Sequence, residues 1–546
     1  GSNNWAVSGS RTASGKPILG GDSHRPLDTP NVYYQAHIAC PEFDTIGFSF
    51  PGCPGFTHFG HNAYVAWCVT HTQADYQDLY VERFGDGTPP TYKIPDGWKE
   101  AEIRHERIKV KNGRTQNLDV ILTRHGAIIR GGPTSGFGIA FKYTATAGPS
   151  KGLQCILPMM RASSAEELDE SMRHWVDPSN NFVFADVHGD IGHLVRGMIP
   201  VRNELNAWLP VPGWTDDHEW RGYVPFDEMP RVRNPETGYI STANNRVTDD
   251  HYPHYIGLEF APDFRARRIA ERLKTLNNCS VQDVAAVHSE RVSIPALTLL
   301  RLLKEVKPLD DLSERGQQRL RSWDGSMDRD SVEPTIYSAF RWCLSNRLIQ
   351  YNLGPIAKES LEASGRGAPF HLRRLESTFH DLAAVDDRSL LPADDDWGSV
   401  MAKALSEGMA YLRERMGGDI DSWVWGSVHF TAPRHPLSDL FPEIAKLLDP
   451  PSVSLGGDGD TPLASSFSPS KPFVISGTSV NRYVFDAGDW NNSAWVVPLG
   501  ASGHAGSPHY ADQASIWGEV QLVPMLYDWD RIAEEAESKQ ELNPER

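Results

Sequence analysis

Ser2 is the residue whose type and position most clearly suggest a chemical role. It leads into the apolar run Trp5-Ala6-Val7, which predicts a buried strand with a serine at its start. A serine hydroxyl is a weak nucleophile that needs a nearby base. A terminal α-amine has an ordinary pKa of about 7.7–8.0, so part of it is neutral at pH 7–8 and can accept the hydroxyl proton. Ser2 could therefore be a nucleophile whose own amine is the base, provided that Gly1 is absent from the active form.

The dipeptide Gly1-Ser2 has a second interpretation, because the same two residues remain when a purification tag is cut off. Gly1 is therefore either the residue that precedes the cleavage point in a precursor whose Gly1–Ser2 bond has not been cut, or a remnant of such a tag. In both cases a chain that keeps Gly1 has the base tied up in a peptide bond, and we expect that form to be inactive. The residues alone leave the two origins open.

A second polar candidate is the pair Asn244-Asn245, which follows Gly238-Tyr239-Ile240. Asparagine pairs after a strand commonly form turns. The functional alternative is a side-chain amide directed at an oxyanion, and loss of one such donor can cost about 10²–10³ in rate. Spacing alone leaves both interpretations open. The phosphate-binding pattern G-x-x-x-x-G-K-[ST] is absent, so nucleotide hydrolysis has no support.

Composition excludes two broad classes of partner. Lys plus Arg total 53 against 71 Asp plus Glu, a formal net charge of −18 over 546 residues. A nucleic-acid-binding surface and a polybasic membrane anchor both need a basic excess, so we expect neither nucleic acid nor membrane as a partner. No run of about eighteen apolar residues occurs, so no membrane-spanning segment is expected.

The elements that must position these residues fall into three stretches. The length exceeds that of one ordinary core and predicts more than one lobe. Residues 2–262 are rich in predicted strands and carry the serine, 263–420 are mainly helical, and strands return in 421–546. This order predicts one core that is interrupted by a helical insertion and completed by the C-terminal stretch.

Local signals give particular elements within these stretches. Asn112-Gly113 lies between two extended apolar segments and predicts a hairpin over 103–122. Ser164 with Glu167 forms a helix-capping pattern. Further strands are predicted at 422–425, 483–485 and 494–497.

Several motifs in this order resemble the β chain of the penicillin acylase family of N-terminal-nucleophile hydrolases, over essentially the whole sequence. The resemblance rests on these segments: Ser2-Asn3-Asn4-Trp5, Phe59-Gly60-His61-Asn62, Asp75-Tyr76-Gln77-Asp78, Arg124-His125-Gly126, 185–192, 209–213, Gly238-Tyr239-Ile240 and Ser507-Pro508-His509-Tyr510. It implies an α+β fold, a four-layer αββα sandwich with a helical insertion, made from a precursor that cuts itself before the nucleophile. It favours Ser2 as a nucleophile over a tag remnant.

The resemblance also implies a function and a partner. The function is that of an acylase that cleaves a linear amide through an acyl-enzyme, with substrates of the penicillin, cephalosporin or N-acyl-homoserine-lactone type. The partner is a smaller α chain from the same precursor, which gives a heterodimer, and a periplasmic or secreted location is expected, with the cytoplasm as the alternative. No cofactor is needed for catalysis. The alternative from a different class is a catalytically silent relative, or an unprocessed precursor, that acts as a binding protein.

Catalytic roles follow from the resemblance by position. Ser2 matches the nucleophile and base, while the backbone N–H of His71 and the amide of Asn244 match the two oxyanion donors. Arg265 matches an arginine that holds the asparagine and the substrate. Without the resemblance, the neighbouring Arg267 would favour an ordinary surface helix charge at this position.

His24 indicates which branch of the family is closer. Penicillin G acylases have glutamine at the matching position, whereas cephalosporin and acyl-homoserine-lactone acylases have histidine, which can tune the protonation of the nucleophile. The family pairs this histidine with an acid, for which Asp486 is the candidate. The alternative is a solvent-facing loop histidine.

Three matched positions would line the acyl pocket. Arg25 falls where penicillin G acylase has an aromatic ring and Asn180 where it has an aliphatic side chain, while Phe59 keeps one aromatic wall. A phenylacetyl preference is therefore not expected, and Arg25 would suit an acyl chain that carries a carboxylate, such as glutaryl. The alternative is that Arg25 points to solvent.

Some family members bind a structural calcium ion, and part of that site is matched here. Asp75, the carbonyl of Gln77, and Asp78 match ligands, and hard oxygen ligands suit calcium. Another ligand position holds Ile256 in place of aspartate. The alternative is that Asp75 and Asp78 form local caps or salt bridges.

Overall fold

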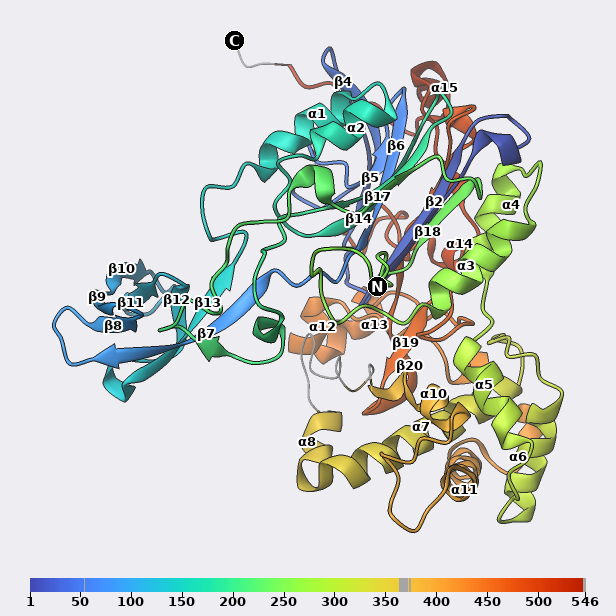
Figure 1. Ribbon diagram of the computed structural model, residues 1–546. Coiled ribbons are helices and arrows are strands. Elements are labelled where there is room, and N and C mark those ends of the chain that lie inside the picture. The colour runs from blue at the N-terminus through green and yellow to red at the C-terminus, as the bar shows by residue number, and fades with distance from the viewer. Residues whose placement is uncertain (54, 363–371, 373–374, 544–546) are drawn as a thin grey trace.

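Two antiparallel sheets form the centre of the molecule (Figure 1). The computed structural model describes residues 1–53, 55–362, 372 and 375–543. In sheet I the strand order is β18-β1-β2-β20-β21-β22, with β19 paired to β20. The strands of sheet I are β1 (Ser2–Val7), β2 (Ile18–Arg25), β18 (Tyr239–Thr242), β19 (Ser465–Ser468), β20 (Lys471–Asp486), β21 (Ala494–Val496) and β22 (Val523–Pro524).

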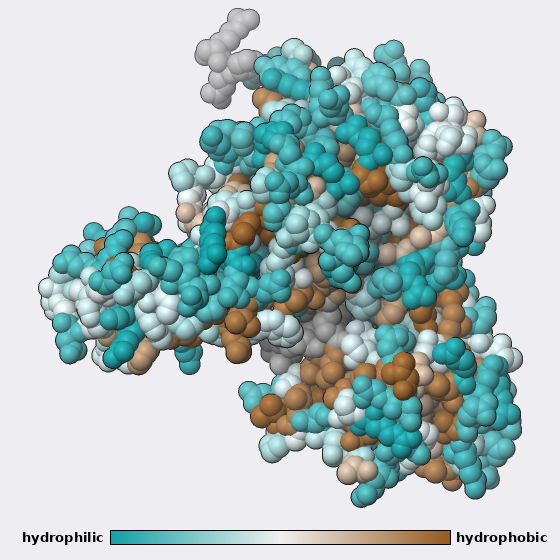
Figure 2. Space-filling view, in the orientation of Figure 1, coloured by the Kyte–Doolittle hydropathy of each residue, from teal (hydrophilic) through white to brown (hydrophobic). Residues whose placement is uncertain are grey.

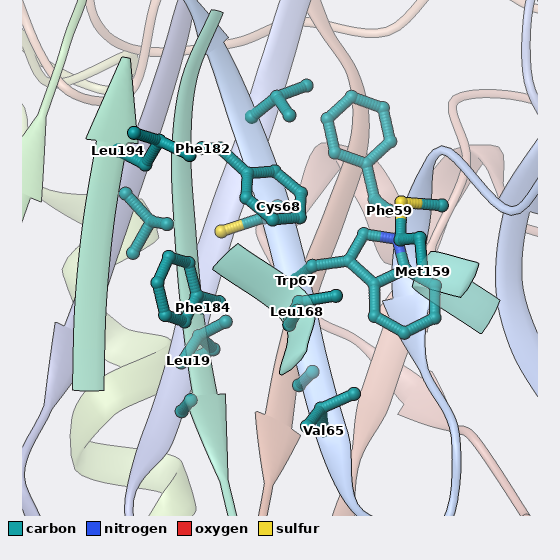
Figure 3. Packing of buried hydrophobic residues seen from close by; sticks show 14 of the residues in the cluster. Leu19, Phe59, Val65, Trp67, Cys68, Met159, Leu168, Phe182, Phe184 and Leu194 are labelled. Atoms are coloured by element: carbon teal, nitrogen blue, oxygen red, sulfur yellow. The ribbon is translucent and has the colours of Figure 1, made fainter. Parts of the chain in front are cut away.

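Sheet II has the order β17-β15-β14-β6-β5-β4-β3. Its strands are β3 (Tyr34–Cys40), β4 (Phe43–Ser49), β5 (Phe59–His61), β6 (Val65–His71), β14 (Asn180–Asp186), β15 (Ile191–Arg196) and β17 (Arg231–Arg233). Side chains from the facing surfaces of both sheets share one apolar core. Figure 3 shows part of it, in which Leu19 of sheet I lies with Trp67, Phe182 and Phe184 of sheet II. Burial of this apolar area is the main stabilising contribution to the sandwich.

Helices cover the outer faces of the two sheets. On sheet II lie α1 (Ile156–Arg161) and α2 (Ala165–Ser171), and on sheet I lie α3 (Phe264–Thr275) and α4 (Val281–Ala285). The Ser164 side chain accepts a hydrogen bond from the backbone of Glu167, which confirms the predicted helix cap. The four layers, helix–sheet–sheet–helix, confirm the αββα sandwich expected from the sequence (Figure 1).

A helical lobe lies below the sandwich in Figure 1 and has its own apolar core. Its helices are α5 (Ile294–Leu303), α6 (Asp311–Arg321), α7 (Glu333–Leu353), α8 (Ala357–Glu362), α10 (Phe379–Ala384) and α11 (Trp397–Met416). The predicted insertion 263–420 therefore includes α3 and α4, which pack on sheet I, as well as this lobe. Residues 363–371, 373 and 374 of the insertion lie outside the described residues.

The strand predicted at 422–425 is wrong. Two short 3₁₀ turns, Ile420–Ser422 and Trp425–Ser427, occupy this stretch. Trp423 and Trp425 are fully buried, so the apolar run belongs to the lobe core without pairing in a sheet. The remaining short helices are α12 (Pro436–Leu440), α13 (Ala445–Leu448), α14 (Ala514–Gly518) and α15 (Trp529–Glu535).

A third sheet projects from the sandwich as an arm, at the left of Figure 1. Its strands are β7 (Gln77–Gly85), β8 (Thr91–Ile94), β9 (Gly97–Glu100), β10 (Glu102–Ile108), β11 (Gln116–Thr123), β12 (Gly126–Gly132), β13 (Phe137–Tyr143) and β16 (Val211–Pro212). Antiparallel pairing of β10 with β11 confirms the predicted hairpin. The surface of the arm is largely polar in Figure 2. None of the helices in the described part of the chain is long and apolar enough to cross a membrane.

Candidate active site

Ser2 begins β1, which lies between the edge strand β18 and β2 in sheet I. Its side chain is buried, with 8% of the residue exposed. The hydroxyl Oγ donates a hydrogen bond to the carbonyl oxygen of Gly1 at 2.6 Å. The hydroxyl thus lies against the peptide bond that precedes it.

Asn244 follows β18 and connects the two sheets at this point. Its carbonyl Oδ1 accepts a hydrogen bond from the backbone N–H of Ser2 at 2.7 Å, and its Nδ2 donates to the carbonyl of His71, at the end of β6, at 2.8 Å. Its backbone has φ of +66°, a left-handed conformation that asparagine tolerates better than most residues. The side chain is therefore fixed next to the serine, as the functional interpretation of Asn244-Asn245 requires.

Arg265 is buried beside Ser2, since it is only 7% exposed and lies near the start of α3. One guanidinium nitrogen donates to the Ser2 carbonyl at 2.8 Å, and the other donates to Asn244 Oδ1 at 3.0 Å. Burial lowers the pKa of Arg265 to about 10, so it stays a cation at neutral pH. Arg265 is therefore not the surface helix charge that its neighbours suggest.

His24 lies across from Gly1 at a β-bulge between Ser23 and His24. The His24 backbone N–H donates to the Gly1 carbonyl at 2.7 Å, and the Gly1 amine donates to the His24 carbonyl at 3.1 Å. Its ring Nε2 lies 2.9 Å from Oδ2 of Asp22. Because Asp22 is buried, the ring is held at a fixed position beside the Gly1–Ser2 bond and is not a solvent-facing loop histidine.

The acid partner of His24 is therefore Asp22, and the candidate Asp486 is wrong. Asp486 pairs with Ile18 at the opposite end of β2 and accepts hydrogen bonds from the backbone of Gly488. Asp22 was not predicted from the sequence, but a signal for it was present. Residues i and i+2 of a strand point to the same face. Asp22 and His24 have this spacing.

The site opens into a cavity of about 250 Å³ between the sandwich and the helical lobe. His24, Asn244 and Arg265 line one side. The lobe side is formed by Tyr337, Arg341 and Trp342 of α7, with Asp458 and Asp460 from the loop before β19. Arg341 forms an ion pair with Asp460 at 2.6 Å. A substrate amide placed here would contact Gly1, His24 and Asn244 on one side and a polar wall of the lobe on the other.

The three predicted acyl-pocket residues do not line this cavity. Phe59 is 1% exposed and packs edge-on against Tyr33, with ring centroids 5.2 Å apart, while the exposed Arg25 lies over the same Tyr33 ring. Asn180 pairs with His71 across β6 and β14. Its Oδ1 accepts from the fully buried Arg196 at 3.2 Å. Phe59 and Asn180 thus lie in sheet II, and Arg25 lies at the end of β2 in sheet I with its side chain over Tyr33.

The residues expected to bind calcium do not fit that ion as they are arranged. Asp75 and Asp78 are 2.8 Å and 2.7 Å from the guanidinium nitrogens of the buried Arg202. Calcium requires six to eight oxygen ligands, whereas the groups that face these carboxylates are the N–H donors of Arg202, Asn206 and Trp220 and one hydroxyl, that of Tyr255. Within the described residues no group of three or more His, Cys, Asp or Glu could hold a metal ion.

Two buried imidazoles near Asp22 predict an acid-sensitive stability. Burial lowers the pKa of His24 and of His288 to about 4, against the opposing effect of Asp22. Between pH 6.5 and 4 the unfolded chain binds these protons and the folded chain does not, so stability falls as the pH falls, by roughly 3 kcal/mol per histidine at pH 4. The pKa of Asp22 is held below its ordinary range, so Asp22 adds to the loss only below that window.

We expect Tm, measured by calorimetry, to drop steadily from pH 6.5 to 4, and His288→Gln to make that drop shallower. Glutamine can keep the hydrogen bond to the Tyr483 carbonyl without taking up a proton. A Tm that stays constant over this range, or an equal slope in the variant, would contradict the assignment.

Comparison with known proteins places this geometry in a family. Residues 1–534 match the family model for penicillin amidase. The penicillin acylase 2 proenzyme of Pseudomonas sp. (strain SE83) is 42% identical, over 100% of this chain and 69% of that protein. Acyl-homoserine lactone acylase QuiP of Pseudomonas fluorescens (strain Pf0-1) is 28% identical, over 97% of this chain and 66% of that protein. The chain thus spans about two thirds of these relatives.

The solved structures support the same fold. A thermostable penicillin G acylase from Alcaligenes faecalis superposes with a TM-score of 0.75 at 19% identity, and the match covers 100% of both chains. Together with the family model and the relative at 42% identity, this shows that the chain belongs to the penicillin amidase family.

Proposed function

We propose that this chain is the nucleophile-bearing part of an acylase that hydrolyses a linear amide through an acyl-enzyme on Ser2. The observation that carries the proposal is the position of the Asn244 side chain. Its oxygen accepts from the Ser2 backbone and its nitrogen donates to the His71 carbonyl at the end of β6, so the side chain contacts both the residue proposed as nucleophile and the residue proposed as the other oxyanion donor.

In the proposed reaction, Ser2 Oγ attacks the amide carbonyl and its proton passes to the free α-amine of the same residue. The developing oxyanion accepts from the backbone N–H of His71 and from the second N–H of Asn244 Nδ2, since the first donates to the His71 carbonyl. The protonated amine then protonates the leaving nitrogen. Water cleaves the resulting ester by the same route in reverse.

Asp22 and Arg265 have supporting roles in this scheme. When His24 donates its Nε2 proton to Asp22, its Nδ1 is left as an acceptor on the side of Gly1. Arg265 holds the Ser2 carbonyl and the Asn244 oxygen, so the asparagine nitrogen is directed away from the cation. Both residues restrict the nucleophile and its oxyanion donors to one arrangement, which is how preorganised sites lower barriers.

The proposed precursor is cut between Gly1 and Ser2. The 2.6 Å contact between Ser2 Oγ and the Gly1 carbonyl oxygen places the hydroxyl next to the bond to be cut. The word proenzyme in the name of the relative from strain SE83 agrees with such processing. We propose a smaller chain from the same precursor as the partner. The exposed side chains of Leu440 and Leu447 in α12 and α13 are compatible with cover by another chain.

The acyl group is proposed to carry a carboxylate, because positive charge gathers on the sheet II side of Ser2. Arg196 is buried, and its guanidinium donates hydrogen bonds to Asn180 Oδ1 and Met172 Sδ. Burial lowers the pKa of Arg196 to about 9. Burial together with the charges of Arg196 and Arg25 keeps the pKa of His58 well below its usual value, so His58 itself is neutral. A carboxylate would be attracted to the exposed guanidinium of Arg25, while the buried Arg196 would contribute only the field of its charge.

We expect the assembled protein to hydrolyse a glutaryl amide with a higher kcat/KM than the matching phenylacetyl or long-chain acyl amide. Arg25→Leu should lower kcat/KM for the glutaryl substrate by about 10- to 100-fold, the value of a charged hydrogen bond of about 1.5–3 kcal/mol, with little effect on the phenylacetyl one. Arg107→Leu, which removes an exposed arginine of β10, is the control. Absence of glutaryl turnover would refute the proposed acyl group.

A further inference from the structure

Arg202 is a buried arginine that joins two acidic residues close to the candidate active site. Its Nε donates to Asp78 Oδ2 at 2.7 Å, and one terminal nitrogen lies 2.8 Å from Asp75 Oδ2. The side chains of Arg202 and Asp78 are both 0% exposed. A fully desolvated charge pair is stable only when each charge keeps its partner, because an unpaired buried charge is strongly destabilising.

The other groups around the two carboxylates are also hydrogen-bond donors. Asp78 Oδ2 accepts from Asn206 Nδ2 at 3.0 Å and from Trp220 Nε1 at 2.5 Å. Asp75 Oδ2 accepts from the Tyr255 hydroxyl at 3.2 Å. A metal ion cannot use N–H donors as ligands, so the contacts of the two Oδ2 atoms are those of a site built around a guanidinium. Asp78 Oδ1 is buried and has no hydrogen-bond partner among the described residues.

The cluster fixes a short segment that begins at the candidate oxyanion donor. Residues 72–76 connect β6, which ends at His71, to β7, which begins at Gln77. Within it, the Gln73 backbone donates to His71 Nδ1 at 3.1 Å, and the Asp75 backbone donates to the Ile256 carbonyl at 2.8 Å. The Asp75 side chain ties the same segment to Arg202, on the loop after β15.

We propose that Arg202 is a positioning residue whose guanidinium takes the place of a divalent cation between Asp75 and Asp78, and so holds the segment that follows His71 without a metal ion. One planar cation with several N–H groups can contact both carboxylates, which is the geometry that arginine supplies and lysine does not. The part of this proposal that concerns the positioning of His71 rests on the proposed function. The part in which Arg202 replaces a divalent cation does not.

The first test uses the unaltered, assembled protein. Thermal unfolding in EDTA, and again with millimolar Ca²⁺ added back, should give the same Tm, and calorimetric titration should detect no calcium uptake. A Tm that falls in EDTA and recovers with Ca²⁺ would overturn the proposal. This test needs no enzymatic activity, so it stands even if the proposed acylase function fails.

The second test removes the guanidinium. Arg202→Gln should lower Tm by roughly 5 °C or more, because it leaves two carboxylates without a cation. Its kcat per titrated active site should fall about 10-fold with KM less affected, and Arg202→Lys should recover part of both values. Arg124→Gln, which removes an arginine paired with Glu219 in the arm, is the matched control.

Two results of the second test would overturn the proposal. One is an Arg202→Gln protein with the Tm and the kcat per active site of the Arg124→Gln control. The other is an Arg202→Gln protein whose lowered Tm and kcat are not improved by the lysine variant. If Arg202→Gln does not fold, the EDTA and Ca²⁺ measurements on the unaltered protein decide the question.

Discussion

Replacing Ser2 by alanine should abolish amide turnover, by about 10⁴-fold or more in kcat, and leave the fold intact. The large loss is expected because the nucleophile has no substitute in the proposed reaction, and loss of the nucleophile in comparable serine enzymes costs at least this much. The small change in stability is expected because the hydroxyl makes one hydrogen bond, to the adjacent Gly1 carbonyl. Turnover of a chromogenic amide and Tm would be measured on the same samples.

The matched control for this experiment is Ser10→Ala. Ser10 is exposed and bonds only to Ser8 nearby, so its loss should change neither turnover nor Tm. Retained amide turnover in the Ser2→Ala protein would exclude Ser2 as nucleophile. It would also exclude the proposed acyl-enzyme, whatever the substrate.

The second large effect should come from Gly1 itself. A chain that begins at Ser2 should exceed a chain that begins at Gly1 by about 10²–10⁴-fold in kcat/KM, the range that a positioned general base contributes. In the longer chain the Ser2 nitrogen is an amide that donates to Asn244 Oδ1 and has no basic lone pair. Both chains would be produced with the same smaller partner chain and compared by turnover and intact mass.

Mass measurement makes this comparison decisive. We expect every active sample to contain the chain without Gly1, and samples that retain Gly1 to be inactive in proportion. Full activity in a protein that still carries Gly1 by intact mass would refute the amine as base. If the chain without Gly1 is also inactive, the result favours the alternative to an enzyme, which is a binding protein.

Local sequence signals predicted those parts of the fold that depend on neighbouring residues. The hairpin around Asn112-Gly113 and the helix cap at Ser164 were both correct, because turn conformation and end capping are decided within a few residues. The strand predicted at 422–425 was wrong. A short apolar run has no period that separates a strand from other buried structure, and here Trp425 stacks on His429 in the lobe core.

The candidate site could be predicted only in part, because some of its contacts depend on segments that are distant in the sequence. Ser2, Asn244, His24 and Arg265 were all named from positions that match the family, although the neighbouring arginines alone favoured a surface position for Arg265; its burial depends on the approach of α3 to the ends of β1 and β18. Helix α3 contains several arginines, and Arg265 shares a helix face with Ile269 and Leu273, so a signal for the inward-facing arginine was present in the sequence. The opposition of Arg202 to Asp75 and Asp78 likewise joins segments more than a hundred residues apart.

The 16-residue strand β20 sets a limit on how this protein can be recombined with its relatives. Its first part places Phe473 in the core of the helical lobe, and its last part places Tyr483 and Phe485 in the core of the sandwich. Between them it pairs with β2, where Ser479 lies opposite His24. A chimaera that takes the lobe from another family member and joins the sequences after β20 therefore also exchanges the strand that lies opposite His24, whereas a junction before β20 separates the donor lobe from its own residue at the position of Phe473.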